Sequence, residues 1–268
     1  MPNTAQWIDS GNLLAQIPLF EGMKPGSLAH IASRARFIHA PCGEILFRKD
    51  DSCAGLYFVV YGQVKLFFTS QQGNEKILDI LDQGHIFGES NLFHDGKHQV
   101  YAQTLSDCFL LHIAKSLIME ELGKSMTFAH RVIDHLARRL FELTREVESY
   151  SLDTGRQRLI NYLLRQALSA DRNGANRGAV NHEPNALTLS LRSRKGVLAS
   201  RLNITHEYFS RLLNELAACG LLSVNGRNIH LKDLNRLRQY ATDSDLPTEQ
   251  PDLQRAMAKV QGSVALSG

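Results

Sequence analysis

The segment of residues 126–150 constrains the fold more than any other stretch of the chain. Apolar residues recur in it at alternating intervals of three and four, and it contains neither proline nor glycine. This spacing, kept up over about seven helical turns, predicts a coiled-coil seam. The seam runs between Met126 and Tyr150 and consists of Ala129, Ile133, Leu136, Leu140, Leu143 and Val147.

The narrowness of this apolar stripe indicates what the helix packs against. About two residues in seven are apolar, which is fewer than a helix in a globular core usually buries. Charged residues such as Arg138, Glu142 and Arg145 fill the positions between the seam residues. We therefore expect a parallel homodimer built on this helix. A helix packed on its own domain is the alternative.

Bulk composition bounds the class of protein. A chain of 268 residues with 43% hydrophobic residues is long enough for two cored domains. No apolar run approaches the roughly 20 residues that cross a bilayer, and the beginning of the chain lacks the pattern of a secretory signal. We expect a cytoplasmic protein without a membrane partner. The four cysteines form no C-x-x-C pair, so neither disulfides nor a sequence-local metal site is expected.

The charge is distributed unevenly along the chain. Residues 1–150 contain 14 Lys and Arg against 17 Asp and Glu, whereas residues 151–240 contain 14 against 6. A strongly basic half is suited to a polyanion such as DNA. Only the second half of the molecule therefore carries the electrostatic pattern of a nucleic-acid-binding protein.

The first half of the chain predicts an antiparallel β-roll. After two short helices at 7–16 and 24–35, short β-rich runs alternate with turn residues such as Gly43, Gly73 and Gly84. Many short strands at close spacing are typical of a sandwich or barrel, whose interior can enclose a small ligand. The predicted strands lie at 44–48, 56–62, 63–69, 76–81 and 108–113.

A short motif at residues 87–93, FGESNLF, marks a candidate effector site in the roll. It places Gly88 and Glu89 at the end of a strand, before a short helical turn. A glycine there lets a ligand approach the backbone amides, and a carboxylate can accept hydrogen bonds from hydroxyl groups. A turn glycine followed by a surface glutamate explains the same residues.

The second half predicts a winged helix-turn-helix. Ser151, Asp153 and Thr154 can cap a helix at 154–168, which a polar loop at 169–185 and a strand at 186–191 follow. Residues 195–202 form the first helix of the motif, with Val197, Leu198, Ala199 and Leu202 facing inward. Asn203 occupies the turn, where it tolerates a left-handed conformation, and Ile204 fills the core between the helices. Asn225-Gly226 predicts the hairpin of the wing, and residues 232–240 a final helix.

The second helix of the motif, residues 206–219, presents the residues that could contact DNA. Phe209, Leu212, Leu213 and Leu216 share its buried face, and Glu207, Ser210 and Arg211 lie on the outward face. Arginine can bind guanine bidentately, and a carboxylate can accept a hydrogen bond from cytosine. The alternative is a helical hairpin in which Glu207 and Arg211 form an ordinary ion pair. Candidate contacts to the DNA backbone are Arg192, Arg194, Lys195, Arg201, Thr205, His206 and Arg227.

The order of these features resembles the family of the cyclic-AMP receptor protein and the fumarate and nitrate reductase regulator (CRP/FNR). The resemblance covers residues 15–240 and includes the pattern V-x-x-G-x-V-K-L-F at 59–67 and the motif at 87–93. It implies an α+β fold with a cyclic-nucleotide-binding-like roll, a dimerisation helix and a winged helix-turn-helix. It further implies a transcription regulator that binds a palindromic operator in double-stranded DNA and contacts RNA polymerase.

Glu207, Ser210 and Arg211 match the Glu-x-x-Ser-Arg triad of the fumarate and nitrate regulator subgroup, which implies half-sites resembling TTGAT. Members that bind cyclic AMP carry an Arg-Ser pair where this chain has Gln99 and Val100. A neutral amide cannot replace a guanidinium at a phosphate, so cyclic AMP is not expected. The first cysteine is Cys42, so the N-terminal ligands of an iron-sulfur cluster are missing. The candidate effector pocket therefore consists of Gly88, Glu89, Gln99 and Val100, with its ligand open.

Residues 62–81 and 207–216 are most similar to the dissimilative nitrate respiration regulator branch of the family. That resemblance implies a haem cofactor that senses nitric oxide. A haem iron needs an axial ligand such as histidine, and the candidates are His94, His98, His112, His130 and His135. Each of them is explained equally by an ordinary solvated or hydrogen-bonded histidine, so no metal ligand is assigned.

The predicted organisation is a sensor at 1–125, a dimerisation helix at 126–150, a DNA-binding domain at 151–240 and a disordered tail at 241–268. The long helix forms one wall of the effector pocket and leads to a hinge at 151–154, so it is also expected to couple the two functions by a shift of population. One alternative keeps the DNA reader with another metabolite or no ligand in the roll. The other is an enzyme with a regulatory roll, but the chain contains no nucleophile-base constellation, P-loop or metal motif.

Overall fold

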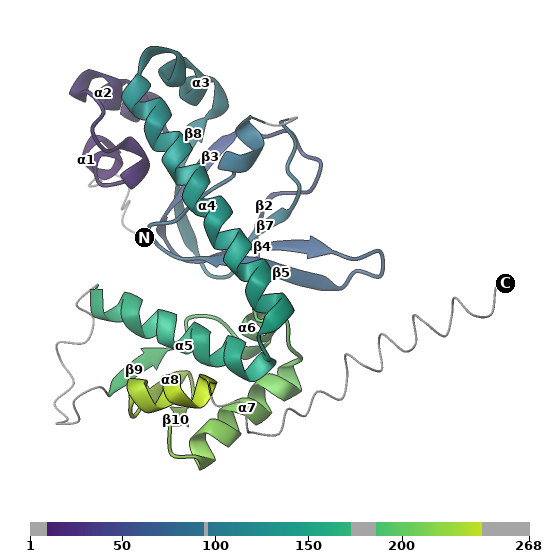
Figure 1. The fold of residues 1–268 in the computed structure, drawn as a ribbon. Coiled ribbons are helices and arrows are strands. Elements are labelled where there is room, and N and C mark those ends of the chain that lie inside the picture. Colours follow the sequence, from purple (N-terminus) through teal and green to yellow (C-terminus); the bar gives the residue numbers. More distant parts are fainter. Residues whose placement is uncertain (1–9, 94–95, 173–185, 243–268) are drawn as a thin grey trace. The chain divides into compact units, whose positions relative to one another are not determined.

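The computed structural model describes residues 10–93, 96–172 and 186–242 (Figure 1). The described residues belong to two compact units. The first contains those within 1–149 together with 193–209, and the second contains those within 150–192 and from 210 onward. The predicted loop at 169–185 falls outside the described residues from residue 173 onward, and the predicted tail does so from residue 243.

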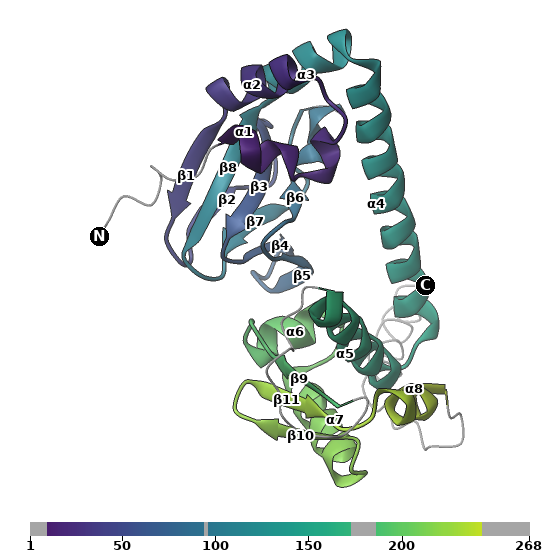
Figure 2. The ribbon, with the colours of Figure 1, turned by 90° about the vertical axis from the view of Figure 1, so that its left-hand side faces the viewer.

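The first unit is built on two antiparallel four-stranded sheets, which confirms the predicted β-roll (Figure 2). Each of the five predicted runs contains a strand. Two further strands, Arg36–Ala40 and Tyr101–Thr104, were not among the predicted runs, whereas the motif at 87–93 had predicted a strand that ends before Gly88. One sheet has the order β1 (Arg36–Ala40), β8 (Cys108–Ala114), β3 (Gly55–Tyr61) and β6 (Ile86–Phe87). The other has the order β2 (Ile45–Phe47), β7 (Tyr101–Thr104), β4 (Val64–Thr69) and β5 (Glu75–Leu81).

Glycine is required where β3 turns into β4. Gly62 has a φ of +95°, and a Cβ atom added there would lie 2.5 Å from the carbonyl oxygen of Asp107. No other residue fits such a backbone conformation at so close an approach. This explains the glycine in the pattern at residues 59–67.

An apolar core at one end of the roll joins the N-terminal helices to the sheets. It is formed by α1 (Ser10–Ala15), the 3-10 turn η2 (Pro18–Phe20), α2 (Pro25–Arg34) and α3 (Lys115–Lys124), the last of which was not predicted (Figure 2). The rings of Phe20 and Phe128 stack in this core at a centroid distance of 5.6 Å. The helices from Ser10 onward are therefore part of the folded unit.

The helix α4 (Met126–Leu152) packs on its own unit only near its beginning. Phe128 and Val132 are buried in the same core as the N-terminal helices, and they are the buried residues of this helix. The rest of α4 follows the roll with partly or fully exposed side chains. The alternative of a helix packed on its own unit therefore holds for the beginning of α4, and the homodimer built on the rest of the helix stays a prediction.

The second unit contains α5 (Gly155–Arg172), a three-stranded sheet and α8 (Leu234–Thr242). The structure confirms the predicted cap of α5 at Thr154. Thr154 Oγ1 accepts a hydrogen bond from the Gln157 amide, and Gln157 Oε1 accepts one from the Thr154 amide. The helix continues to Arg172, so the predicted start of a loop at residue 169 was too early.

The sheet of the second unit has the order β10 (Leu222–Asn225), β11 (Asn228–Leu231) and β9 (Leu187–Ser190). Asn225 pairs with Asn228, so the two loop residues of the wing hairpin are Gly226 and Arg227. The predicted turn at Asn225-Gly226 was wrong by one residue. Gly226 has a φ of +60° and Arg227 has a negative φ, which is the pattern of a type II′ rather than a type I′ turn.

Candidate nucleic-acid interface and effector region

The helix-turn-helix is formed by α6 (Lys195–Arg201) and α7 (His206–Ala218). Asn203 has a φ of +57°, as predicted, and the Ile204 amide donates to the Ala199 carbonyl at 3.0 Å. Thr205 Oγ1 accepts a hydrogen bond from the Tyr208 amide at 3.2 Å and so caps α7. The turn is therefore fixed by local backbone conformation and one capping side chain. Ile204 itself is half-buried.

The two faces of α7 differ as the sequence predicted. Phe209, Leu212, Leu213 and Leu216 are all buried. His206, Glu207 and Arg211 are exposed and Ser210 is half-buried. Glu207 lies in the first turn, where a carboxylate also interacts favourably with the helix dipole. The structure thus gives α7 a polar outward face that begins at the capped end of the helix.

The seven candidate contacts to the DNA backbone are not equivalent. Arg192, Arg194, Thr205, His206 and Arg227 are exposed, and Lys195 is half-buried. The side chain of Arg201 is only 17% exposed and forms ion pairs with Asp79 and Glu146. Arg201 is therefore already bound to carboxylates in this arrangement, unlike the exposed candidates.

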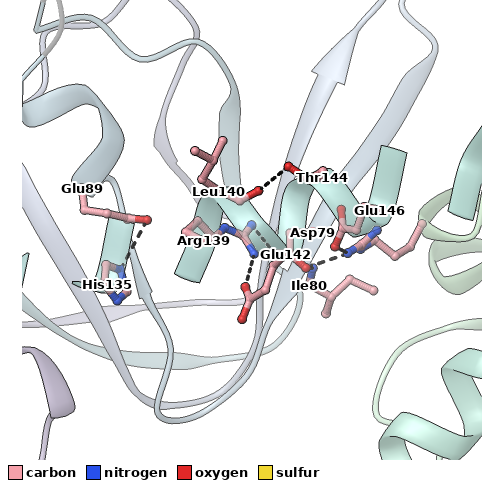
Figure 3. A network of polar contacts seen from close by, with 10 residues as sticks. Asp79, Ile80, Glu89, His135, Arg139, Leu140, Glu142, Thr144 and Glu146 are labelled. Carbon is pink, nitrogen blue, oxygen red and sulfur yellow. Dashed lines mark hydrogen bonds and ion pairs between the residues drawn. The ribbon is translucent and has the colours of Figure 1, made fainter. Parts of the chain in front are cut away.

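The glycine turn of the roll lies where the motif at 87–93 predicted it. Gly88 follows β6 with a φ of +87° and precedes the 3-10 turn η3 (Glu89–Leu92). A Cβ atom at Gly88 would lie 3.1 Å from the Gly55 carbonyl oxygen, so the turn packs closely on β3. The Glu89 side chain is 12% exposed, and its Oε1 lies 3.7 Å from Nε2 of His135 on α4 (Figure 3). Glu89 therefore faces the long helix.

The other two residues of the predicted pocket, Gln99 and Val100, precede β7. Gln99 is exposed, and its side-chain amide donates to the Lys97 carbonyl at 3.4 Å. Val100 is half-buried and packs against the core of the roll. The grouping of Gln99 and Val100 with Gly88 and Glu89 in one pocket stays a prediction.

Aromatic rings fill the interior between the two sheets. Phe47, Tyr57 and Phe87 contact one another, and the His98 ring stacks on Phe47 at 3.6 Å. His98 is 1% exposed, and its Nδ1 lies 3.3 Å from Nδ2 of Asn91. Burial lowers the pKa of the His98 imidazole, and the charge of Asp51 opposes this shift. His98 is thus a neutral ring of the core, which sequence reasoning had not predicted.

Two histidine nitrogens near the glycine turn are buried without a hydrogen-bond partner, Nε2 of His112 and Nε2 of His135. His112 on β8 lies beside Tyr57, with a centroid distance of 4.7 Å, and its Nε2 lies 2.8 Å from a Cβ atom built on Gly55. Burial lowers the pKa of His112, and Arg36 lowers it further. His130 is exposed and His94 lies outside the described residues. Within the part of the chain that is described, no group of three or more His, Cys, Asp and Glu could hold a bare metal ion.

The residues of the predicted seam on α4 differ in their exposure. Met126, Ile133, Leu140 and Val147 follow one another at intervals of seven and are each more than 60% exposed. The other seam residues, Ala129, Leu136 and Leu143, are half-buried, and Leu136 packs against the core of its own unit. The positions four residues after Ile133 and Leu140 hold the small residues Ala137 and Thr144, which are both exposed. The predicted seam therefore stays a prediction, and alternate positions of it are the most exposed in the single chain.

Two family models match the chain in succession. Residues 37–125 match the cyclic nucleotide-binding domain and residues 157–240 match the Crp-like helix-turn-helix domain. The cyclic AMP receptor protein of Thermus thermophilus is 28% identical over 227 residues, which are 84% of this chain and 96% of that protein. FixK2 from Bradyrhizobium japonicum has a similar fold, with a TM-score of 0.65, 21% identity, and coverage of 76% of this chain and 96% of its own. The c-di-GMP responsive regulator CLP from Xanthomonas campestris gives a TM-score of 0.60, 21% identity and coverage of 78% and 99%.

The β-roll, the long helix and the helix-turn-helix together define a DNA-binding transcription regulator. The chain belongs to the CRP/FNR family of these regulators, and relatives that match it along most of its length are transcription regulators rather than enzymes. Among the helices of the described residues, none combines the length and apolar character needed to span a bilayer.

Proposed function

We propose that the chain is a homodimeric regulator that reads an inverted repeat of TTGAT-like half-sites under the control of a small effector. The observation that carries this proposal is the polar face of α7, where Glu207 and Arg211 are exposed beside the half-buried Ser210 while the opposite face is buried. A major-groove helix needs such an outward face, with base-contacting residues near its N-terminal end.

Each of the three residues has a distinct part in the proposed reading. Arg211 binds the O6 and N7 atoms of a guanine, and Glu207 accepts a hydrogen bond from a cytosine amino group. Ser210 makes a short contact to a neighbouring base edge. The exposed Arg192, Arg194, His206 and Arg227 hold phosphates and set the position of the helix, which gives affinity but no sequence preference.

The homodimer is proposed to form through the exposed face of α4. Four large apolar side chains at heptad spacing, from Met126 to Val147, would otherwise remain in water. The small residues Ala137 and Thr144 between them would let a second helix approach closely. Two recognition helices would then contact half-sites about 34 Å apart, one turn of DNA.

The effector is proposed to act at the glycine turn beside α4. Support comes from Gly88, from Glu89, and from the Nε2 atoms of His112 and His135, which are buried there without a hydrogen-bond partner. A haem that carries nitric oxide is our first candidate, because either histidine could supply an axial nitrogen and the bound haem would supply gas binding. Another metabolite is the alternative. The names of the Thermus and Xanthomonas relatives refer to two different cyclic nucleotides, and the exposed Gln99 provides no cation for a phosphate.

In this proposal residues 1–125 sense, residues 126–150 dimerise and residues 151–240 bind DNA. RNA polymerase is the expected partner at the promoter, and the protein would work in the cytoplasm, where the operators are. Effector binding would shift the population toward the arrangement that fits the two half-sites.

Fluorescence anisotropy with a labelled TTGAT inverted repeat tests the DNA proposal. We expect at least about a thousandfold tighter binding than to a scrambled duplex at the same salt concentration. Equal affinity for the two duplexes would overturn the proposed reading. An absorption spectrum of the anaerobically purified protein with added haemin, before and after nitric oxide, tests the cofactor, and the absence of a shifted Soret band would exclude haem.

A further inference from the structure

A partly buried polar network surrounds Arg201, the last residue of α6. Its Nη2 donates to Glu146 Oε1 on α4, and its Nε lies 3.4 Å from Asp79 Oδ1 on β5. The three side chains are between 13% and 23% exposed. Two carboxylates thus hold one guanidinium in a partly buried position, where charge-assisted hydrogen bonds are stronger than at an open surface.

Asp79 is shared between two arginines. Its Oδ2 accepts a hydrogen bond from Arg139 Nη2 at 2.6 Å, and Arg139 also pairs with Glu142 at 3.3 Å (Figure 3). An aspartate in the otherwise apolar run of β5 must be paired, because an isolated buried carboxylate is costly. This aspartate therefore connects α4 and α6 through a single carboxylate.

The free edge of the same strand holds the backbone of α6. The Ile77 amide donates to Ser200 Oγ at 3.1 Å, and Lys76 Nζ donates to the Ser200 carbonyl at 2.5 Å and to Asn203 Oδ1 at 2.9 Å. β5 lies at the edge of its sheet, so the Ile77 amide would otherwise face water. The contacts extend from the end of α6 into the turn of the helix-turn-helix.

From this arrangement we infer an inhibitory latch, formed by Asp79 and Glu146 around Arg201, that holds the protein in a state of low DNA affinity. The inference rests on the proposed function, because it makes DNA the competitor for Arg201. A guanidinium bound by two carboxylates cannot also bind a phosphate, and the contacts of Ser200 and Asn203 keep the turn on β5. Binding of DNA through Arg201 therefore requires the latch to open.

The latch also provides a physical connection to the glycine turn. His135, Arg139 and Glu146 are spaced by four and seven residues and contact, in order, Glu89, Asp79 and Arg201. They share one face of α4. A shift of this face caused by an effector at Glu89 would change the pairing of Arg139 with Asp79, and hence the hold on Arg201. Coupling between the glycine turn and the helix-turn-helix requires a contact that is either formed or broken, and the pairing of Arg139 with Asp79 is such a contact.

The test uses Glu146→Gln in the full-length protein without effector, and measures affinity for the TTGAT repeat and for a scrambled duplex. We expect about a three- to tenfold gain in affinity on both duplexes, because the coupling of partly exposed ion pairs is modest. The matched control is Glu142→Gln, which removes the same charge from the same helix but contacts Arg139 instead of Arg201. It is expected to leave the affinity within about twofold of wild type.

Two further measurements separate the latch from a general charge effect. Glu146→Gln should give no gain when Arg201→Gln is already present, because the competing guanidinium is gone. Hydrogen exchange of the Ile77 amide should become faster in Glu146→Gln and remain slow in Glu142→Gln. Unchanged or weaker DNA binding by Glu146→Gln, or an equal gain in Glu142→Gln, would overturn the latch. If the wild-type protein did not discriminate between the two duplexes, the proposed recognition of TTGAT half-sites would be overturned. The latch would still be tested, because hydrogen exchange at Ile77 does not involve DNA.

Discussion

The Glu89 carboxylate and the His135 imidazole approach each other to 3.7 Å, which joins the glycine turn of the roll to the middle of α4. The distance exceeds that of a hydrogen bond, so the pair contributes little to the free energy of folding. We predict that Glu89→Gln changes the free energy of unfolding by less than about 1 kcal/mol. Urea unfolding checks this, and a larger loss would identify the pair as a structural element rather than a contact available to an effector.

The close packing of Gly88 on Gly55 predicts that a substitution at Gly88 lowers the free energy of unfolding more than Glu89→Gln does. Gly88→Ala introduces both a left-handed alanine and a Cβ atom 3.1 Å from a carbonyl oxygen. We expect a loss of about 2 kcal/mol in the free energy of unfolding. Gly73→Ala is the matched control, because Gly73 has a φ of +82° with nothing within 4 Å, and it should lose only about 1 kcal/mol. Equal losses in the two variants would show that the contact with Gly55 is not tight.

Burial of His98 and His112 predicts that the protein loses stability in mild acid. Their folded-state pKa values lie below the value of about 6.5 for an unfolded chain, so at lower pH the unfolded state binds more protons than the folded state. The contribution of these histidines to the free energy of unfolding is therefore fully present above about pH 6.5, and it is lost as the pH falls toward the folded-state pKa values. Urea unfolding at pH 7.5 and 5.5 should show this decrease. A His98→Phe variant should lose less unfolding free energy between these two pH values. A loss equal to that of the wild type would contradict the assignment to His98.

The exposed face of α4 predicts which substitutions separate a dimer into monomers. Ile133→Asp with Leu140→Asp places charges at two positions that are more than 60% exposed in the single chain, so the fold should survive. In a dimer seam each unpaired buried charge costs about 3–5 kcal/mol, and sedimentation should then detect monomer. Arg145→Asp reverses a charge on the opposite face of the helix and should leave the dimer intact. A persistent dimer in the double variant would exclude this face.

Local rules account for the parts of the fold that were predicted. The turn at Asn203, the cap at Thr205 and the buried face of α7 each depend on residues a few positions apart. The side of the heptad pattern that packs on its own unit could not be predicted, because the packing of Leu136 against the N-terminal core is a tertiary contact. The partners of Arg201 lie 55 and 122 residues away, so its sequence neighbours suggested only an exposed basic residue. The one available signal was Asp79, an acid within an apolar strand.

Comparison of Arg211 with Arg227 tests whether base reading and phosphate binding are assigned correctly. Both side chains are exposed, one on the outward face of α7 and the other at the tip of the wing hairpin. Arg211→Ala should cost about 1–3 kcal/mol on the TTGAT repeat and relax the preference at one guanine, because a bidentate contact is lost. Arg227→Ala should weaken binding to all sequences equally and reduce the slope of log affinity against log salt by about 1. Anisotropy titrations over a series of salt concentrations give the slope. The same titrations with duplexes in which the guanine is replaced by each other base give the base preference. An equal loss on specific and scrambled DNA for Arg211→Ala would make Arg211 a phosphate contact and leave Glu207 as the remaining candidate for base reading.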